Sequence, residues 1–463
     1  MVDSDGENPI PTSYTDASSS ATRLHHSNNG LLHRSLRDST LNKTHFVPAE
    51  HPQFETPLTL KERLHEKVDN FREESSKKTR FEWLSLFLPI FRWLKDYKVG
   101  RDLPKDLLAG ATVGMMVIPQ GMSYAKLAGL PVEYGLYAAF TPVIFYSLFG
   151  TCRQLAVGPV AVLSLMLSAG LTPLVTDDGE VTTEEQQNEY NILAIQTSMM
   201  VGAIYIAMGL LRLGFVTIFL SHAVTSGFTS GTAVIIAMSQ LKYILGINIP
   251  RSDQIIEILR NIFAHISDFN WKTFVLGTSC IITLLFMKEL GKRYKKFKWV
   301  RYAGPLVVTA FCILLSYLLD FDALGIPIVK TIPPGLPDLT VSWWSPLDTR
   351  IFKTVFLIVI VGFMESISIA RQLAAKNQYD LDPSLELLGL GVSNFCGSMF
   401  QSYPITGSFS RSAIKQDTGA VSNISGIITG LIVMITLLLL TSIFELMVRC
   451  FFGCLDNLIS SYY

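Results

Sequence analysis

Charge is scarce in this 463-residue sequence. Charged side chains make up 16% of the residues, whereas soluble globular domains usually carry about 25%. The shortage is uneven, because 32 of the 76 charged residues lie within residues 1–106. Residues 107–174 contain only Lys126, Glu133 and Arg153. A soluble fold of this length needs a charged outer face, so a water-soluble enzyme is excluded for most of the chain.

The net charge and the number of cysteines are also low. The formal net charge is zero, which removes the basic signature of a nucleic-acid-binding protein. The six cysteines lie mostly inside apolar runs and lack the spacing of a zinc site or a disulfide framework. We therefore predict no nucleic-acid partner, no metal and no cofactor. The first residues lack a basic segment followed by an apolar core, so a signal peptide is not expected.

Long apolar runs dominate the remainder of the sequence. A helix needs about 20 residues to cross a bilayer, and nine runs are predicted to do so. Two shorter segments, 158–173 and 408–418, follow stretches with Gly and Pro and are predicted to be half-helices. The predicted fold class is an all-α polytopic membrane protein with about eleven membrane segments. The nine predicted spans are 107–128, 132–149, 191–211, 214–241, 271–290, 302–319, 351–373, 384–399 and 421–444.

The N-terminal part has a different composition. Residues 1–80 are polar and cannot bury enough apolar surface to fold, so a disordered tail is expected. Residues 81–106 begin with the aromatic run FEWLSLFLPIFRWLKDYKVG. This segment is predicted to be an amphipathic helix in the membrane interface, with a short spanning helix as the alternative.

Basic residues predict the orientation of the chain. The flank 95–105 and the loop 288–301 are rich in Lys and Arg, which marks cytoplasmic segments. The predicted spans place six crossings between them, so both fall on one side. The acidic loop 176–190 then lies outside and the tail 1–80 lies in the cytoplasm. The plasma membrane is the expected location, with an internal membrane left open.

Two motifs with Gly and Pro predict an anion site. In RQLAVGPVAVLSL, Arg153–Leu165, a helix is expected to begin at Pro159, because proline suits the first helical position. In SYPITGSFSRSA, Ser402–Ala413, a second helix is expected to begin near Ser408. The parity of crossings predicts that their N-termini face each other near the middle of the membrane. Each N-terminus presents N–H groups and about half a positive charge, as in inverted-repeat transporters.

Polar residues at membrane depth support this prediction. Pro119 interrupts the first span, and Gln120 and Tyr124 share a face beyond it; helix packing is the plainer interpretation of these two. Arg411 lies in the second half-helix and Glu365 in an otherwise apolar span. Charges at membrane depth are costly and usually functional. A structural salt bridge between Arg411 and Glu365, or a snorkelling arginine, is the alternative.

Charge counting connects the two charged residues. The two helix ends supply about one positive charge in total, and Arg411 adds a second, which together neutralise a dianion such as sulfate. At about 6 Å and an effective dielectric constant near 20, an ionised Glu365 opposes the anion by about 2.8 kcal/mol. The resulting hypothesis is that anion binding favours protonated Glu365 and so couples a proton to the anion.

These motifs resemble the SulP family of sulfate permeases and related anion exchangers, closest to its sulfate/proton symporters. The resemblance spans about residues 100–440. It implies fourteen segments in two inverted repeats of seven, with the anion between the third and tenth segments. Residues 107–320 would form the first repeat and residues 351–444 part of the second. The matching stretches are PQGMSYAKLAGLPVEYGLY, RQLAVGPVAVLSL, SHAVTSGFTSGTAVIIAMSQLKYILG, FMESISIAR and SYPITGSFSRSA.

The resemblance also implies which residues contact the anion. They would come from the first segment, the start of the third and the start of the tenth: Gln120, Tyr124, Val160, Ser408, Phe409, Ser410 and Arg411. Glu365, on the eighth segment, is similar to the acid of the proton-coupled group. Many family members have an aromatic residue where this chain has Val160, which implies a wider pocket.

The sequence departs from the family pattern after Phe444. Residues 445–463 match no family segment, and neither the last gate segments nor a STAS domain is found, so a C-terminally truncated member is expected. A homodimer is expected from the resemblance. The predicted function is a secondary active transporter of sulfate or a similar oxyanion, with the bilayer and a proton as further partners.

Other functions stay open. An anion channel or exchanger on the same scaffold would not need Glu365. A truncated, non-transporting regulatory subunit would fit the missing gate segments. An intramembrane enzyme is least expected, because no nucleophile–base pair or metal cluster lies among the spans. Nucleobase carriers share the fold class, but their mostly neutral substrates would not need Arg411. Selenate, molybdate, oxalate and bicarbonate remain alternatives to sulfate.

Overall fold

The described part of the chain is almost entirely helical. The computed structural model describes residues 97–176, 183–214, 222–247, 255–294, 298–321, 333–340 and 347–445, with isolated residues at 89, 90, 94, 323, 324, 326 and 328. The predictions for the tail 1–80, for most of 81–98 and for the segment 446–463 lie outside these residues.

The helices of the first predicted repeat follow the predicted spans closely, with one addition. Every apolar run predicted between 107 and 319 overlaps a helix. The helices are α5 (Val99–Ala128), α6 (Val132–Phe149), α7 (Ala161–Val175), α8 (Glu184–Leu210), α9 (His222–Leu245), α10 (Ile255–Ala264), α11 (Trp271–Arg293) and α12 (Lys298–Leu319).

The predicted spans of the second repeat also overlap helices of the structure. Its last helix changes to a π-helical stretch at Thr436–Leu440 and ends with α17 (Thr441–Phe444). A single 3₁₀ turn at Thr349–Ile351 leads into α13. The other elements are α13 (Phe352–Lys376), α14 (Pro383–Ser398), α15 (Phe409–Asp417) and α16 (Ile424–Ile435), with strands β1 (Val157–Gly158) and β2 (Thr406–Gly407).

Five helical segments among the described residues are long and apolar enough to cross a membrane. Two shorter apolar segments, Ala161–Val175 and Val307–Leu319, accompany them. The five are Val132–Phe149, Glu184–Leu210, Trp271–Gly291, Thr349–Lys376 and Ile424–Phe444.

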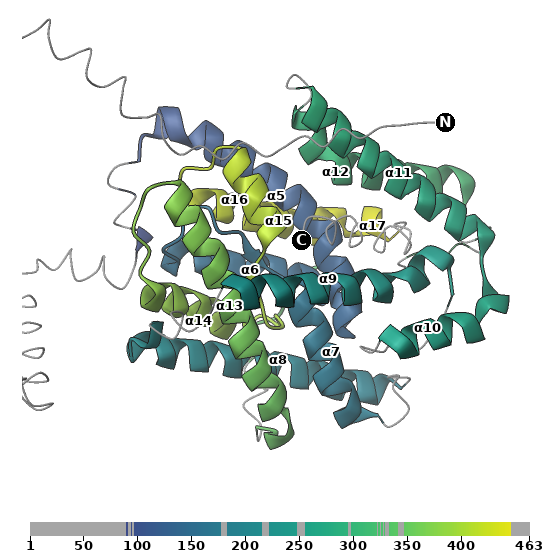
Figure 1. The fold of residues 1–463 in the computed structure, drawn as a ribbon, viewed down its shortest axis with the longest axis horizontal. Helices are drawn as coiled ribbons and strands as arrows, with labels where there is room; N and C mark the ends of the chain where they lie inside the picture. Colours follow the sequence, from purple (N-terminus) through teal and green to yellow (C-terminus); the bar gives the residue numbers. More distant parts are fainter. Residues whose placement is uncertain are drawn as a thin grey trace, which may run out of the picture. The chain divides into compact units, whose positions relative to one another are not determined.

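Small residues allow neighbouring helices to pack closely. α14 runs beside α8 (Figure 1), and a Cβ built on Gly391 of α14 would lie 2.6 Å from the backbone nitrogen of Ile206 on α8. A Cβ on Gly110 of α5 would lie 2.7 Å from that of Ile428 on α16. Such contacts between small residues are typical of helices inside a membrane bundle.

Helix α10 was missed by the sequence prediction. Ile258 and Ile262 are buried against α9, whereas Ile256 and Phe263 are exposed. The helix has 10 residues, too few to cross a bilayer. A search for long apolar runs therefore does not select it.

The predicted boundary at residue 107 is not a helix end. α5 begins at Val99 and continues through Pro119 to Ala128. Residues 99–106, which the sequence assigned to the interfacial segment, therefore belong to the same helix as Gln120. Asp106 holds this part in the bundle, because its Oδ1 accepts hydrogen bonds from the backbone N–H groups of Val421 (2.8 Å) and Ser422 (3.1 Å).

Candidate functional site

Two short strands bring the half-helices together. β1 pairs with β2 in the antiparallel sense, with Val157 opposite Gly407 and Gly158 opposite Thr406. α7 begins just after β1 and α15 just after β2. The pairing therefore brings the starts of the two helices close together.

No N-cap side chain accepts a hydrogen bond from the first N–H groups of α7 or α15. The N-cap residues are Val160 for α7 and Ser408 for α15, and neither side chain accepts a hydrogen bond from its helix. The Ser408 hydroxyl instead lies 3.4 Å from the hydroxyl of Ser410. Val160, Ser408 and Ser410 are buried, and Phe409 is half-buried against the core.

Arg411 joins three parts of the site. Its side chain is fully buried. Nη1 donates to Oε1 of Gln120 on α5 (3.2 Å), and Nη2 donates to the carbonyl oxygen of Pro159 at the start of α7 (2.8 Å). The arginine of one half-helix therefore contacts both the start of the other half-helix and helix α5.

Gly158 makes room for this arginine. Its φ of +150° is one that residues with a side chain rarely adopt, and a Cβ there would lie 3.3 Å from Nη2 of Arg411. Glycine adopts such a backbone conformation without the steric cost of a Cβ.

Gln120 and Tyr124 are both buried on α5, one turn apart. The Nε2 group of Gln120 makes no hydrogen bond within the described residues. A buried amide donor left without a partner is unusual, and this one belongs to the residue that contacts Arg411.

Glu365 is buried on α13, with 7% of its surface exposed. Neither carboxylate oxygen has a hydrogen-bond partner in the part of the chain that the structure describes. The hydrogen-bonded salt bridge to Arg411, the alternative role considered above, is therefore not formed. The charge of Arg411 still acts on this carboxylate through space.

Helix α14 positions both strands through two residues that the sequence prediction missed. Glu386 is buried and accepts hydrogen bonds from the backbone N–H groups of Thr151 (3.0 Å) and Cys152 (3.1 Å), ahead of β1. Asn394 accepts one from Ile405 N–H (2.8 Å) and donates one to Ile405 O (3.2 Å), directly before β2. The sequence feature that could have identified Glu386 and Asn394 is their polarity inside an apolar span.

The far end of α15 is also tied to the chain before β1. Lys415 is buried, and its Nζ donates to the carbonyl oxygen of Leu155 (3.1 Å). The Ser412 hydroxyl accepts a hydrogen bond from Ala156 N–H (2.9 Å). The sequence prediction gave no role to either residue.

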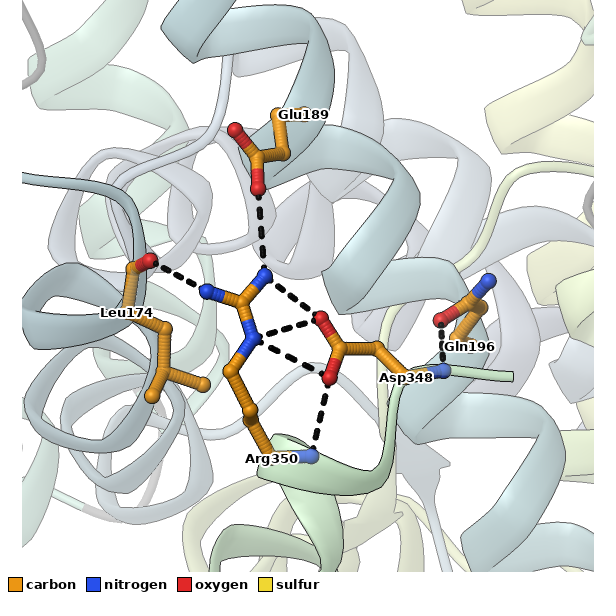
Figure 2. Close-up of polar contacts among 5 residues, drawn as sticks. All are labelled: Leu174, Glu189, Gln196, Asp348 and Arg350. Atoms are coloured by element: carbon orange, nitrogen blue, oxygen red, sulfur yellow. Dashed lines mark hydrogen bonds and ion pairs between the residues drawn. The ribbon is translucent and has the colours of Figure 1, made fainter. Parts of the chain in front are cut away.

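The opposite end of α7 is held by Arg350, which lies in the turn before α13. Its guanidinium donates to the carbonyl oxygen of Leu174 in the last turn of α7 (3.1 Å) and to Glu189 of α8 (3.3 Å), as Figure 2 shows. Asp348 pairs with the same guanidinium (2.6 Å), and this hydrogen-bonded contact lowers the pKa of Asp348. A cation at a helix C-terminus is favourable, so Arg350 ties α7, α8 and α13 together at this end.

Half-helices that begin beside each other inside a helical bundle characterise membrane transporters built from inverted repeats, and this chain has that architecture. The family model described as "Sulfate permease family" matches residues 103–460. The chain therefore belongs to the sulfate permease family. The match extends over residues 445–460, which the sequence prediction had set apart from the family pattern.

Curated relatives match most of the chain. The chain is 43% identical over 372 residues to "Probable sulfate transporter 4.2" of Arabidopsis thaliana, covering 80% of this chain and 54% of the relative. It is also 43% identical over 369 residues to "Sulfate transporter 4.1, chloroplastic" of the same plant, with coverage of 80% and 52%. The chain spans about half the length of these relatives.

Solved structures have the same fold. The chain matches SLC26A9 with a TM-score of 0.76 and 26% identity, over 89% of this chain and 65% of that one. It matches the transmembrane domain of the cyanobacterial bicarbonate transporter BicA with a TM-score of 0.67 and 21% identity, over 78% of this chain and 89% of that one. The predicted fold class, an all-α integral membrane protein, is confirmed.

Proposed function

We propose that this chain is the membrane part of a secondary active transporter for sulfate or a similar small oxyanion, with uptake coupled to a proton. The observation that carries the proposal is the fully buried Arg411, held by Gln120 and Pro159 where the helices α7 and α15 begin. The names of the curated relatives as sulfate transporters support the choice of anion.

The anion would be held by positively charged groups and hydrogen-bond donors. Arg411 contributes a full positive charge, and the starts of α7 and α15 contribute about half a charge each. The Nε2 group of Gln120, which has no partner in the described part of the chain, would supply a further donor. Tyr124, Val160, Ser408, Phe409 and Ser410 would line the remaining surface.

Glu365 would carry the proton. An ionised carboxylate without hydrogen bonds is costly to bury, and a nearby dianion adds repulsion. The neutral carboxyl group therefore accompanies the bound anion, and both are released together. Sulfate affinity is then expected to fall as the pH rises, and Glu365→Gln should remove that dependence.

An anion exchanger or channel is the second candidate. The fold shared with SLC26A9, described as an anion transporter, favours it. Such a function needs no carboxylate that changes protonation. Sulfate uptake with equal rates at several pH values, in the wild type and in Glu365→Gln, would therefore favour this candidate over the symporter.

Equilibrium binding of radiolabelled sulfate to the purified chain tests the anion site directly. A hydrogen-bonded contact with a charged group contributes about 1.5–3 kcal/mol, so Arg411→Gln should weaken binding by about tenfold or more. Arg293→Gln, at an exposed position at the end of α11, is the matched control and should bind as the wild type does. Wild-type affinity in Arg411→Gln would contradict the proposed site.

A further inference from the structure

A chain of hydrogen bonds joins the turn of α13 that carries Glu365 to strand β2. The backbone N–H of Gly407 donates to the hydroxyl of Ser366 (2.8 Å). The Ser366 and Thr406 hydroxyl oxygens lie 2.5 Å apart, and the Thr406 hydroxyl donates to the carbonyl oxygen of Gly362 (2.7 Å). Since Thr406 uses its proton on Gly362, the proton between the two hydroxyls belongs to Ser366.

This arrangement replaces a contact that α13 could make alone. A serine inside a helix commonly returns its hydroxyl to the carbonyl four residues earlier, which for Ser366 is Gly362. Here the Thr406 hydroxyl, from β2, stands between them. Both side chains are buried. The inserted hydroxyl makes the backbone of one helical turn depend on the position of another segment.

The same turn is held on its other side by α8. The Tyr205 hydroxyl donates to the carbonyl oxygen of Val359 (2.9 Å), and a Cβ on Gly362 would lie 2.8 Å from that hydroxyl oxygen. The turn with Glu365 therefore lies between α8 and β2. Tyr205 and Thr406 therefore contact this part of α13 from two different elements.

The other end of the hydrogen-bond chain reaches the anion site. Thr406 and Gly407 pair with Gly158 and Val157 of β1. Ser408, the N-cap residue of α15, follows directly, and Arg411 lies one turn further along α15.

We propose that Ser366 and Thr406 are positioning residues that couple the protonation of Glu365 to the geometry of the anion site. The inference rests on the proposed proton-coupled function and names the mechanical link within it. The titratable groups that act on Glu365 within the described residues are Arg411 of α15 and Tyr205 of α8. Removing a hydroxyl from the link changes neither Arg411 nor Tyr205. A loss of coupling in such a variant would therefore come from the position of α13 relative to β2 and not from a changed charge near Glu365.

Thr406→Val removes the hydroxyl that joins Ser366 to Gly362 and so weakens the link, while the hydrogen bond from Gly407 N–H to the Ser366 hydroxyl remains. Valine keeps the shape of threonine, and Ser366 can then return its hydroxyl to Gly362, so the buried groups of α13 keep partners. Thr406→Ser restores the hydroxyl. Thr429→Val is the matched control, because the Thr429 hydroxyl also joins two segments, by donating to Gly110 of α5 (3.0 Å), but lies outside the link.

The experiment measures the dissociation constant of radiolabelled sulfate for the purified chain across a pH series. If one proton accompanies each anion, the wild-type constant rises by up to about tenfold per pH unit. Thr406→Val should bind within about threefold of the wild type at low pH but change by less than about threefold per pH unit. Thr406→Ser and Thr429→Val should both retain the wild-type dependence.

Three results would overturn the inference. A wild-type pH dependence in Thr406→Val would show that the link carries no coupling. Weak binding at every pH, in Thr406→Ser as well, would show a purely structural role. A wild type without pH dependence, matching Glu365→Gln, would remove the proton-coupled function itself and the link with it; this outcome is recognised from the wild type alone.

Discussion

The guanidinium of Arg411 and the side-chain amide of Gln120 lie in contact although 291 positions separate them in sequence, with Nη1 donating to Oε1 across 3.2 Å. The contact uses the acceptor oxygen of the amide, and its Nε2 donor has no hydrogen-bond partner among the described residues. Both side chains therefore offer hydrogen-bond donors, which suits the oxyanion proposed above.

Gly158→Ala should weaken sulfate binding and destabilise the protein. Alanine at a φ of +150° is strained, and its methyl group would lie 3.3 Å from Arg411 Nη2. Backbone strain of this kind costs about 1–3 kcal/mol. Thermal unfolding and sulfate binding of the purified chain measure both effects.

Gly100→Ala is the control for that variant. A Cβ there meets no atom within 4 Å, and the residue lies in the first turn of α5. Alanine in a helix is favoured over glycine by about 0.5–1 kcal/mol. Equal behaviour of the two variants would contradict the assigned role of Gly158.

Asn394→Ala should loosen β2. The substitution leaves the buried N–H and C=O groups of Ile405 without their side-chain partner, which costs about 1–3 kcal/mol. We expect a lower unfolding temperature together with weaker sulfate binding. Asn377→Ala, at a half-buried position at the end of α13, should lower neither to the same degree. Full sulfate affinity in Asn394→Ala would show that β2 does not depend on α14.

Arg350→Gln should loosen the last turn of α7 without abolishing sulfate binding. The substitution removes the donors to Leu174 and Glu189, so backbone amides in that turn should exchange with deuterium faster than in the wild type. Unchanged exchange would contradict the contact shown in Figure 2.

The same contact predicts a pH effect on stability. The pKa of Asp348 is lowered by its hydrogen bond to Arg350, so its contribution to folding is present above the ordinary aspartate pKa of about 3.9. It is lost as the pH falls through the lower pKa of the folded protein. The difference in unfolding temperature between the wild type and Arg350→Gln should therefore be larger at pH 7 than at about pH 3. The opposite trend would contradict this pairing.

Sequence patterns predicted the helices well because apolar run length is a local property. The half-helices predicted at 158–173 and 408–418 correspond to α7 and α15. α7 begins at Ala161, two residues after the predicted start at Pro159, and α15 begins at Phe409, next to the predicted Ser408. α10 was missed because a 10-residue amphipathic helix resembles a loop between spans. The start of α5 was placed too late because Asp102 and Asp106 interrupt the apolar run, although Asp106 is buried against the turn before α16.

The candidate site was predictable only in part. Arg411 and Gln120 stand out as polar residues at membrane depth, and their motifs indicated a shared place. The acceptor at Pro159 is a backbone carbonyl, which no side-chain pattern reveals. Glu386 and Asn394 are equally polar, but their partners at Thr151 and Ile405 depend on how α14 packs. The sequence also left open an Arg411–Glu365 salt bridge, which the packing of α13 does not form.

Locating a bound anion tests the central claim most directly. Selenate shares the charge and shape of sulfate and scatters X-rays anomalously, so a structure of the chain with selenate would show its position. We expect the anion within hydrogen-bond distance of the Arg411 guanidinium and of the first N–H groups of α7 and α15. An anion bound elsewhere, beyond hydrogen-bond distance of the Arg411 guanidinium, would contradict the account.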